Sequence, residues 1–82
     1  MERHLQAPEV HYEYAQTLAI QGKMQRALKE LQTAAKLDPN DPKYPFESGM
    51  ISNYLNKAED AEKYFLETLS IDPQHIDAAY EV

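Results

Sequence analysis

The chain contains no cysteine, so its 82 residues have no disulfide framework and no thiolate chemistry. It has no apolar run approaching the roughly 20 residues that span a bilayer, and its first residues do not resemble a signal peptide. We therefore expect no membrane insertion, and a cytoplasmic protein is the default expectation. The two glycines and five prolines fall at the edges of segments and do not form a linker.

Basic residues are also scarce, with eight Lys and Arg against fourteen Asp and Glu and a net charge of −6. The imbalance is greatest in residues 42–82, which carry three basic and eight acidic side chains. An acidic surface repels phosphate backbones and anionic lipids, so we expect no nucleic-acid partner and no anionic membrane partner. A charged content of 27% and a hydrophobic content of 43% are typical of a folded soluble domain.

Residues that could hold a metal are scattered. His4, His11 and His75 lie far apart in the sequence, and zinc needs three or four convergent ligands. The acidic segment 38–41 resembles the start of a calcium loop, but Pro42 occupies the next ligand position and the glycine of the sharp turn is missing. The sequence therefore predicts no metal and no cofactor.

Catalytic patterns are equally lacking. No serine has the flanking glycines of a nucleophile elbow, no Ser/His/Asp set can be assembled by spacing, and no glycine-rich loop could bind a phosphate. Some acidic residues occur in pairs on the faces of predicted helices. Carboxylates in such positions are ordinarily solvated surface charges, so these pairs do not indicate a catalytic site. We expect no enzymatic activity and assign no catalytic residue.

A repeat with a period of about 34 residues is the strongest pattern that is present. Residues 37–39 (Leu-Asp-Pro) are matched by residues 71–73 (Ile-Asp-Pro), and Pro8 is matched by Pro42. Ala27 is likewise matched by Ala61. A period of this length that contains two helical stretches is typical of stacked helix-turn-helix repeats.

Apolar spacing predicts helices over residues 8–21, 23–37, 42–55 and 57–71. Gly22 and Asn56, which occupy equivalent positions of the two repeats, are the residue types that best adopt the left-handed conformation after a helix. Pro45 lacks a donor and restricts Tyr44, so it predicts a late or irregular start to the third helix.

A last helical segment begins after Pro73, with its apolar phase formed by Ile76, Ala79, Tyr80 and Val82. It stops after about two turns, so we expect it to be either the start of a third repeat or a capping helix. Because roughly three repeats are usually needed for a stable stack, excision from a longer array is the other expectation.

Residues 8–41 and 42–75 resemble two tetratricopeptide repeats, with 76–82 opening a third unit and 1–7 forming an N-terminal extension. The resemblance implies an all-α fold, an α-solenoid of antiparallel helix pairs with four helices and a short C-terminal one. It also implies small residues where paired helices approach, so that Ala15 faces Ala27 and Gly49 faces Ala61. The residues assigned to structural packing are Ala15, Ala27, Leu31, Gly49, Ala61 and Phe65.

The same resemblance implies that the first helix of each pair lines a concave groove that binds a peptide. Carried over by position, the candidate peptide-binding residues are Tyr12, Gln16, Phe46, Met50, Asn53, Tyr54 and Tyr80. We expect Ile20, at a neighbouring position, to be core. The face holds Glu9, Glu13, Glu47 and Glu81 but only Lys43 as a base, so it favours an apolar, aromatic or basic segment over an acidic carboxylate tail.

Two alternatives remain open. The helix that carries Phe65, Leu66 and Leu69 has only a short segment to cover it, which favours self-association, for example as a homodimer through this C-terminal face. The chain is alternatively a docking or regulatory fragment of a larger multidomain protein.

Overall fold

The computed structural model describes residues 7–81. Within that range the chain forms five helices and no strand, which confirms the all-α class. The helices are α2 (Pro8–Ile20), α3 (Met24–Leu37), α4 (Lys43–Tyr54), α5 (Ala58–Ile71) and α6 (Ile76–Glu81). Residues 1–6 of the expected N-terminal extension, and the expectations placed on His4 and Val82, lie outside the described residues.

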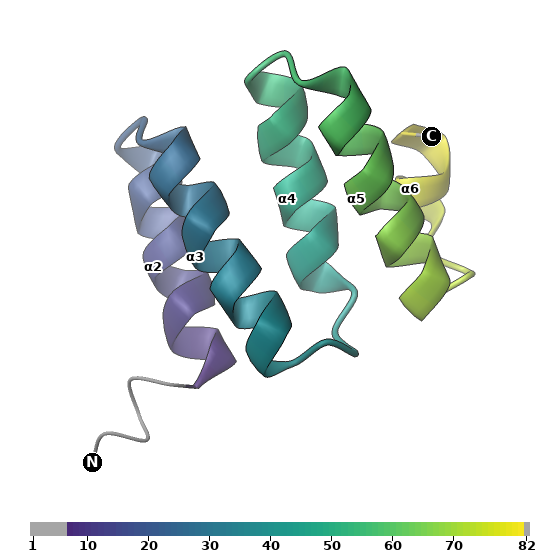
Figure 1. Cartoon of the computed structure of the whole chain (residues 1–82), viewed down its shortest axis with the longest axis horizontal. Coiled ribbons are helices and arrows are strands. Elements are labelled where there is room, and N and C mark those ends of the chain that lie inside the picture. Colours follow the sequence, from purple (N-terminus) through teal and green to yellow (C-terminus); the bar gives the residue numbers. More distant parts are fainter. Residues whose placement is uncertain (1–6, 82) are drawn as a thin grey trace.

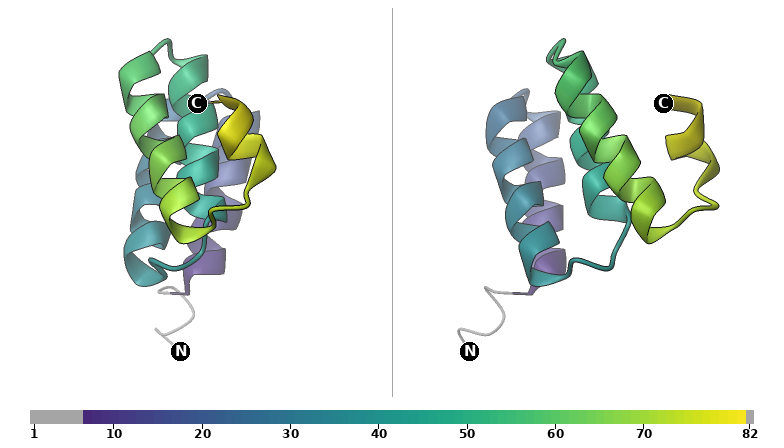
Figure 2. Two further views of the ribbon diagram at one scale, coloured as in Figure 1. Left: turned by 90° about the vertical axis from the view of Figure 1, so that its right-hand side faces the viewer. Right: turned by 45° about the vertical axis from the view of Figure 1, so that its right-hand side comes forward.

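Successive helices run in opposite directions and stack side by side (Figure 1). Helix α2 packs against α3 and α4 packs against α5, while α3 joins the two pairs by contacting α4. The short α6 contacts α5 at the end of the stack away from α2 and α3 (Figure 2). This arrangement confirms the predicted α-solenoid of antiparallel helix pairs.

Both helix pairs turn at the expected residues. Gly22 has a φ of 82° and Asn56 a φ of 63°, so both occupy the left-handed region. In each turn the following lysine donates its backbone N–H across the turn, from Lys23 to the Leu18 carbonyl and from Lys57 to the Ser52 carbonyl, at 2.8 Å in both cases. The equivalence shows that the repeat extends to the hydrogen bonds of the turns.

The irregular start that was predicted for the third helix is wrong. Pro42 already has helical angles, with φ −68° and ψ −15°, and its carbonyl accepts the Phe46 N–H at 3.1 Å. Pro45 is the third residue of α4, where a backbone N–H has no acceptor inside the helix. The missing donor of Pro45 therefore costs nothing, and its ring is buried.

The core consists of two clusters. The first contains the buried residues Ala15, Leu18, Ala27, Leu31, Ala34, Tyr44 and Ile51. The second contains Ala61, Phe65 and Ala78, with Phe46 and Leu69 packed against it. Helix α4 is shared, because its Tyr44 and Ile51 belong to the first cluster while Phe46 contacts the second.

The seam within the second helix pair contains one very close contact. A Cβ atom added to Gly49 would lie 2.6 Å from Cε1 of Phe65, and its three nearest atoms all belong to that ring. Gly49 therefore faces the Phe65 ring of α5. The reason is size, because the Phe65 ring extends from α5 to the α4 backbone and occupies the space that glycine leaves.

One expectation about exposure is also wrong. Ile20, expected in the core, is 86% exposed at the end of α2. In α6 the buried side chain is Ala78, whereas Ile76, Ala79 and Tyr80 are exposed. Ala78 occupies the same repeat position as the buried Tyr44, where the first helix of a unit meets the preceding pair. The face of α6 that is buried against the preceding repeat is therefore not the face on which its larger apolar residues lie.

A candidate peptide-binding pocket between α2 and α4

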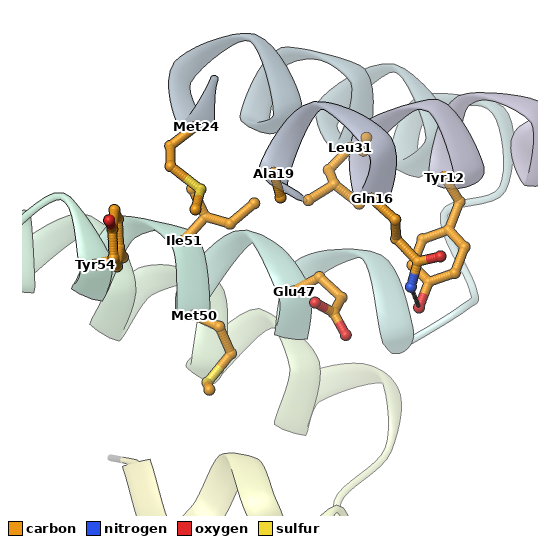
Figure 3. A pocket seen from close by; sticks show the side chains of 10 residues that line it. Tyr12, Gln16, Ala19, Met24, Leu31, Glu47, Met50, Ile51 and Tyr54 are labelled. Carbon is orange, nitrogen blue, oxygen red and sulfur yellow. Dashed lines mark hydrogen bonds between the residues drawn. The ribbon is translucent and has the colours of Figure 1, made fainter. Parts of the chain in front are cut away.

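A pocket of about 160 Å³ lies between α2 and α4, with part of α3 behind it (Figure 3). Its wall is mostly apolar, and the polar side chains are confined to a few positions. The lining residues are Tyr12, Ala15, Gln16, Ala19, Met24, Leu31, Glu47, Met50, Ile51 and Tyr54.

The pocket exists because small residues line the α2 side. Ala15 and Ala19 present only methyl groups to the space, while Leu31 of α3 and Ile51 of α4 form buried apolar surface behind them. Met24 extends from the start of α3 toward Ile51 and closes one end (Figure 3). Because methionine has flexible torsions and a polarisable sulfur, this end can adapt to more than one ligand shape.

Tyr12 forms the other end of the pocket and is held by several contacts. Its ring centroid lies 5.7 Å from that of Tyr44, with the planes inclined by 58°. Its hydroxyl accepts a hydrogen bond from Nε2 of Gln16 at 3.0 Å, and the Lys43 ammonium lies 4.7 Å from the ring centroid. A side chain restrained in this way loses little entropy when a ligand packs against it.

Glu47 gives the pocket its charge. Burial raises the pKa of this half-buried carboxyl above its ordinary value of 4.5. Burial also raises the pKa of the Tyr12 phenol, with the negative charges of Glu47 and then Asp41 as further causes. Tyr12 thus stays protonated at neutral pH, and Glu47 is the one carboxylate among the lining residues.

The structure brings together four of the seven predicted peptide-binding residues, namely Tyr12, Gln16, Met50 and Tyr54. Three others do not line the pocket. Phe46 packs into the second core cluster, with its ring centroid 5.8 Å from Phe65 and 4.8 Å from His75, whereas Asn53 and Tyr80 are exposed on α4 and α6. Their peptide-binding role stays a prediction.

Sequence reasoning missed Met24 and Ile51 as pocket residues and counted Glu47 only as one of several acidic residues of the face. Met24 is the first residue of a second helix, and its counterpart in the other repeat is Ala58, so the repeat gives no signal for it. Ile51 directly follows Met50 and was assigned no groove position. Only the packing of α3 behind α2 and α4 brings these side chains to the pocket.

Within residues 7–81 there is neither a metal-binding cluster nor a membrane-spanning helix. No three His, Asp or Glu side chains of residues 7–81 gather closely enough to hold a metal ion. Across the same residues, every helix is too short or too polar to cross a membrane.

Antiparallel helix pairs that recur along the chain, with a pocket on the side of the first helices, define a helical-repeat protein of the α-solenoid class. Family models described as tetratricopeptide repeat match residues 8–41 and 46–75, and the chain belongs to this family. The resemblance noted from the sequence is thus confirmed. Repeats of this family generally mediate protein–protein interactions and are typically non-catalytic.

Solved structures agree with the fold. Two crystal structures of MamA superimpose with TM-scores of 0.89 and 0.88, at 21% sequence identity in both cases. Each match covers 93% of this chain but only 44% and 42% of the MamA chains, so the chain spans less than half their length. At this identity the likeness shows the fold alone. A comparison with curated protein sequences found no match.

Proposed function

We propose that this chain is a non-catalytic module that binds a peptide segment of a protein partner on the face formed by α2 and α4. The observation that carries the proposal is the apolar pocket between these helices. An apolar cavity of about 150 Å³ takes up a benzene molecule, and the pocket here measures about 160 Å³. The pocket thus has room for one aromatic or branched aliphatic side chain.

One inserted side chain does not make a complex by itself. Burying it contributes roughly 1.5–3 kcal/mol, while even a millimolar complex requires about 4 kcal/mol. The ligand must therefore extend beyond the pocket and touch further residues of the same face. Tyr54 is 70% exposed at one end of the pocket, and Asn53 is exposed beside it. An extended or helical segment that follows α4 would contact both.

An acidic ligand is disfavoured on this face. Glu47 lines the pocket, and Glu9 and Glu13 are exposed on α2. Lys43 does not offset them, because its ammonium is engaged by Asp41 at 3.8 Å and by two tyrosine rings. Like charge would thus oppose a carboxylate tail, and the proposed ligand is apolar, aromatic or basic.

The test is selection of binders from a random peptide library displayed against the whole chain, followed by affinity measurement with Tyr54→Ala. This substitution removes a pocket wall that is mostly exposed, so the fold should tolerate it and the affinity should fall about tenfold or more. The matched control is Tyr14→Ala, which removes a half-exposed tyrosine of α2 that does not line the pocket. Selected peptides that bind both variants as tightly as the original chain would show that the pocket is not the site.

Self-association is the second candidate, favoured by exposed apolar side chains at the α5–α6 end of the stack. Leu66 is 50% exposed and Ile76 is 70% exposed, and Tyr80 is more exposed than either. Sedimentation velocity over a range of concentrations tests it. A dimer that Tyr80→Glu dissociates would support this role, whereas a monomer up to hundreds of micromolar would remove it.

A further inference from the structure

We infer that the peptide recognised by this pocket carries a lysine or arginine next to the apolar residue that enters it, and that Glu47 is the residue that selects the base. The inference rests on the proposed function, because it names the chemistry of the ligand for the same pocket. It assigns a specificity role to one side chain that the sequence analysis counted only among the acidic residues of the face.

The position of Glu47 is the first argument. It lies on α4 between Met50 and the Tyr12 end of the pocket, with its carboxylate beside the space that a ligand would occupy (Figure 3). The apolar floor formed by Ala15, Leu31 and Ile51 lies behind it. A segment that inserts an apolar side chain toward the floor therefore places its neighbouring residue near the Glu47 carboxylate.

The lack of a cation for Glu47 within residues 7–81 is the second argument. The ion pairs in that range join His11 to Glu30 at 2.7 Å and Lys43 to Asp41 at 3.8 Å. Lys43 precedes Glu47 by four residues, a spacing that brings opposite charges together on a helix. Its ammonium is instead directed to Asp41 and lies over the Tyr12 and Tyr44 rings, 4.7 Å and 5.4 Å from their centroids.

Gln16, the polar amide among the lining residues, is committed as well. Gln16 donates an amide N–H to the hydroxyl of Tyr12, the residue that closes the pocket, at 3.0 Å. This hydrogen is therefore not donated to Glu47. Glu47 is thus a half-buried carboxylate that has lost part of its hydration without gaining a counter-ion. Burial is the only cause of its raised pKa. A ligand ammonium or guanidinium placed against it would restore the stabilisation that burial removed.

The charges around Glu47 reinforce the preference. Tyr12 faces it from α2 as a neutral phenol, and Asp41, in the loop before α4, adds negative charge near the same end. Glu9 and Glu13 are exposed on α2. The one base of this face, Lys43, is engaged as described, so a basic residue of a ligand would be attracted by several carboxylates and opposed by one ammonium that already has a partner.

The experiment uses three peptide amides with identical Ser-Gly flanks and a central Phe-Lys, Phe-norleucine or Phe-Glu pair, titrated into the isotope-labelled full chain at near-physiological salt. Norleucine keeps the aliphatic stem of lysine without its charge. Chemical-shift changes of the pocket residues give the dissociation constants. We expect Phe-Lys to bind about tenfold more tightly than Phe-norleucine, and Phe-Glu to bind most weakly.

Glu47→Gln should abolish the preference for Phe-Lys over Phe-norleucine, so that the two peptides bind this variant equally. Glu13→Gln, which neutralises an exposed carboxylate of α2 outside the pocket, should retain the preference. In the original chain the preference should be full at pH 7 and disappear as the pH falls through the raised pKa of Glu47. In Glu47→Gln, binding should not change over that range.

The outcomes separate the two proposals. Equal binding of Phe-Lys and Phe-norleucine to the pocket would overturn the selection of a base and leave the proposed peptide-binding function standing. A Phe-Lys preference that survives in Glu47→Gln would also overturn the role of Glu47. If none of the probes shifts the pocket resonances at millimolar concentration, the selection of a base at this pocket fails, while the proposed peptide-binding function is decided by the library selection and Tyr54→Ala.

Discussion

The contact between Gly49 and Phe65 allows one prediction in which two known effects oppose each other. Replacing glycine by alanine in the middle of a helix stabilises it by about 1 kcal/mol. In α4 the same methyl group would lie 2.6 to 2.8 Å from three atoms of the Phe65 ring. Carbon atoms normally pack at about 3.5–4.0 Å, so the ring would have to move by nearly 1 Å.

The ring has little freedom to move, because Phe65 is only 1% exposed and also packs against Phe46. Overpacking of a core costs about 1–3 kcal/mol, and a gap this short favours the upper part of that range. Subtracting the helix-propensity gain leaves Gly49→Ala destabilised by about 2 kcal/mol. For a domain of this size that loss lowers the melting temperature by roughly 8–16 °C.

Urea and thermal unfolding followed by circular dichroism measure both quantities. The double variant Gly49→Ala with Phe65→Leu provides the control, because a smaller side chain opposite the new methyl should make the two substitutions cost less together than the sum of their separate costs. Asn53→Ala, at an exposed position of the same helix, should show the propensity gain alone. Stabilisation by Gly49→Ala would refute the close-packing argument, since helix propensity would then decide the outcome.

Three further predictions concern single groups. Ser52 is buried on α4 and its hydroxyl has no hydrogen-bond partner among the described residues, so Ser52→Ala should raise the free energy of unfolding by about 1 kcal/mol. Ser48→Ala, on the same helix, should instead lower the free energy of unfolding by about 0.5–1.5 kcal/mol, because the Ser48 hydroxyl donates to the Tyr44 carbonyl at 2.9 Å. Urea unfolding of both variants measures this contrast, and equal effects of the two substitutions would contradict the prediction. Asn56→Ala should cost about 1 kcal/mol in the same assay, because alanine tolerates the left-handed φ of 63° poorly, whereas Asn56→Gly should not destabilise the chain. Burial, followed by the charges of Asp41 and other nearby groups, raises the pKa of Tyr44 from 10.0 to about 12, so the folded state holds this proton more tightly and the chain should lose stability as the pH rises from 10 toward 12. Tyr44→Phe should show a smaller loss over that range, and an unchanged pH profile would contradict the assignment.

The sequence predicted the helices well because their limits depend on local chemistry. Gly22 and Asn56 fix the turns through their backbone conformation, and the repeated Asp-Pro pairs end the second helix of each unit. The orientation of a side chain toward a neighbouring helix is not local. Ile20 was expected in the core for its apolar character, but it shares its repeat position with Tyr54, and both side chains are largely exposed at the ends of first helices.

The site was predicted in part for the same reason. Repeat positions led to Tyr12 and Met50, which line the pocket, but also to Phe46, which fills the second core cluster. Whether a large residue at such a position faces a ligand or a neighbouring helix depends on the next elements of the stack. Phe46 meets His75 and Phe65, and that contact depends on side chains from two later segments that periodicity does not place.

The sharing of α4 between the two core clusters sets the order in which the chain should come apart. We expect the amide hydrogens of α4 to exchange with solvent when both clusters open, so they should be the slowest of residues 7–81. Helix α6, which buries only Ala78, should exchange first. Every wall of the pocket belongs to α2, α3 or α4, so the binding face should persist while α6 has already frayed from α5.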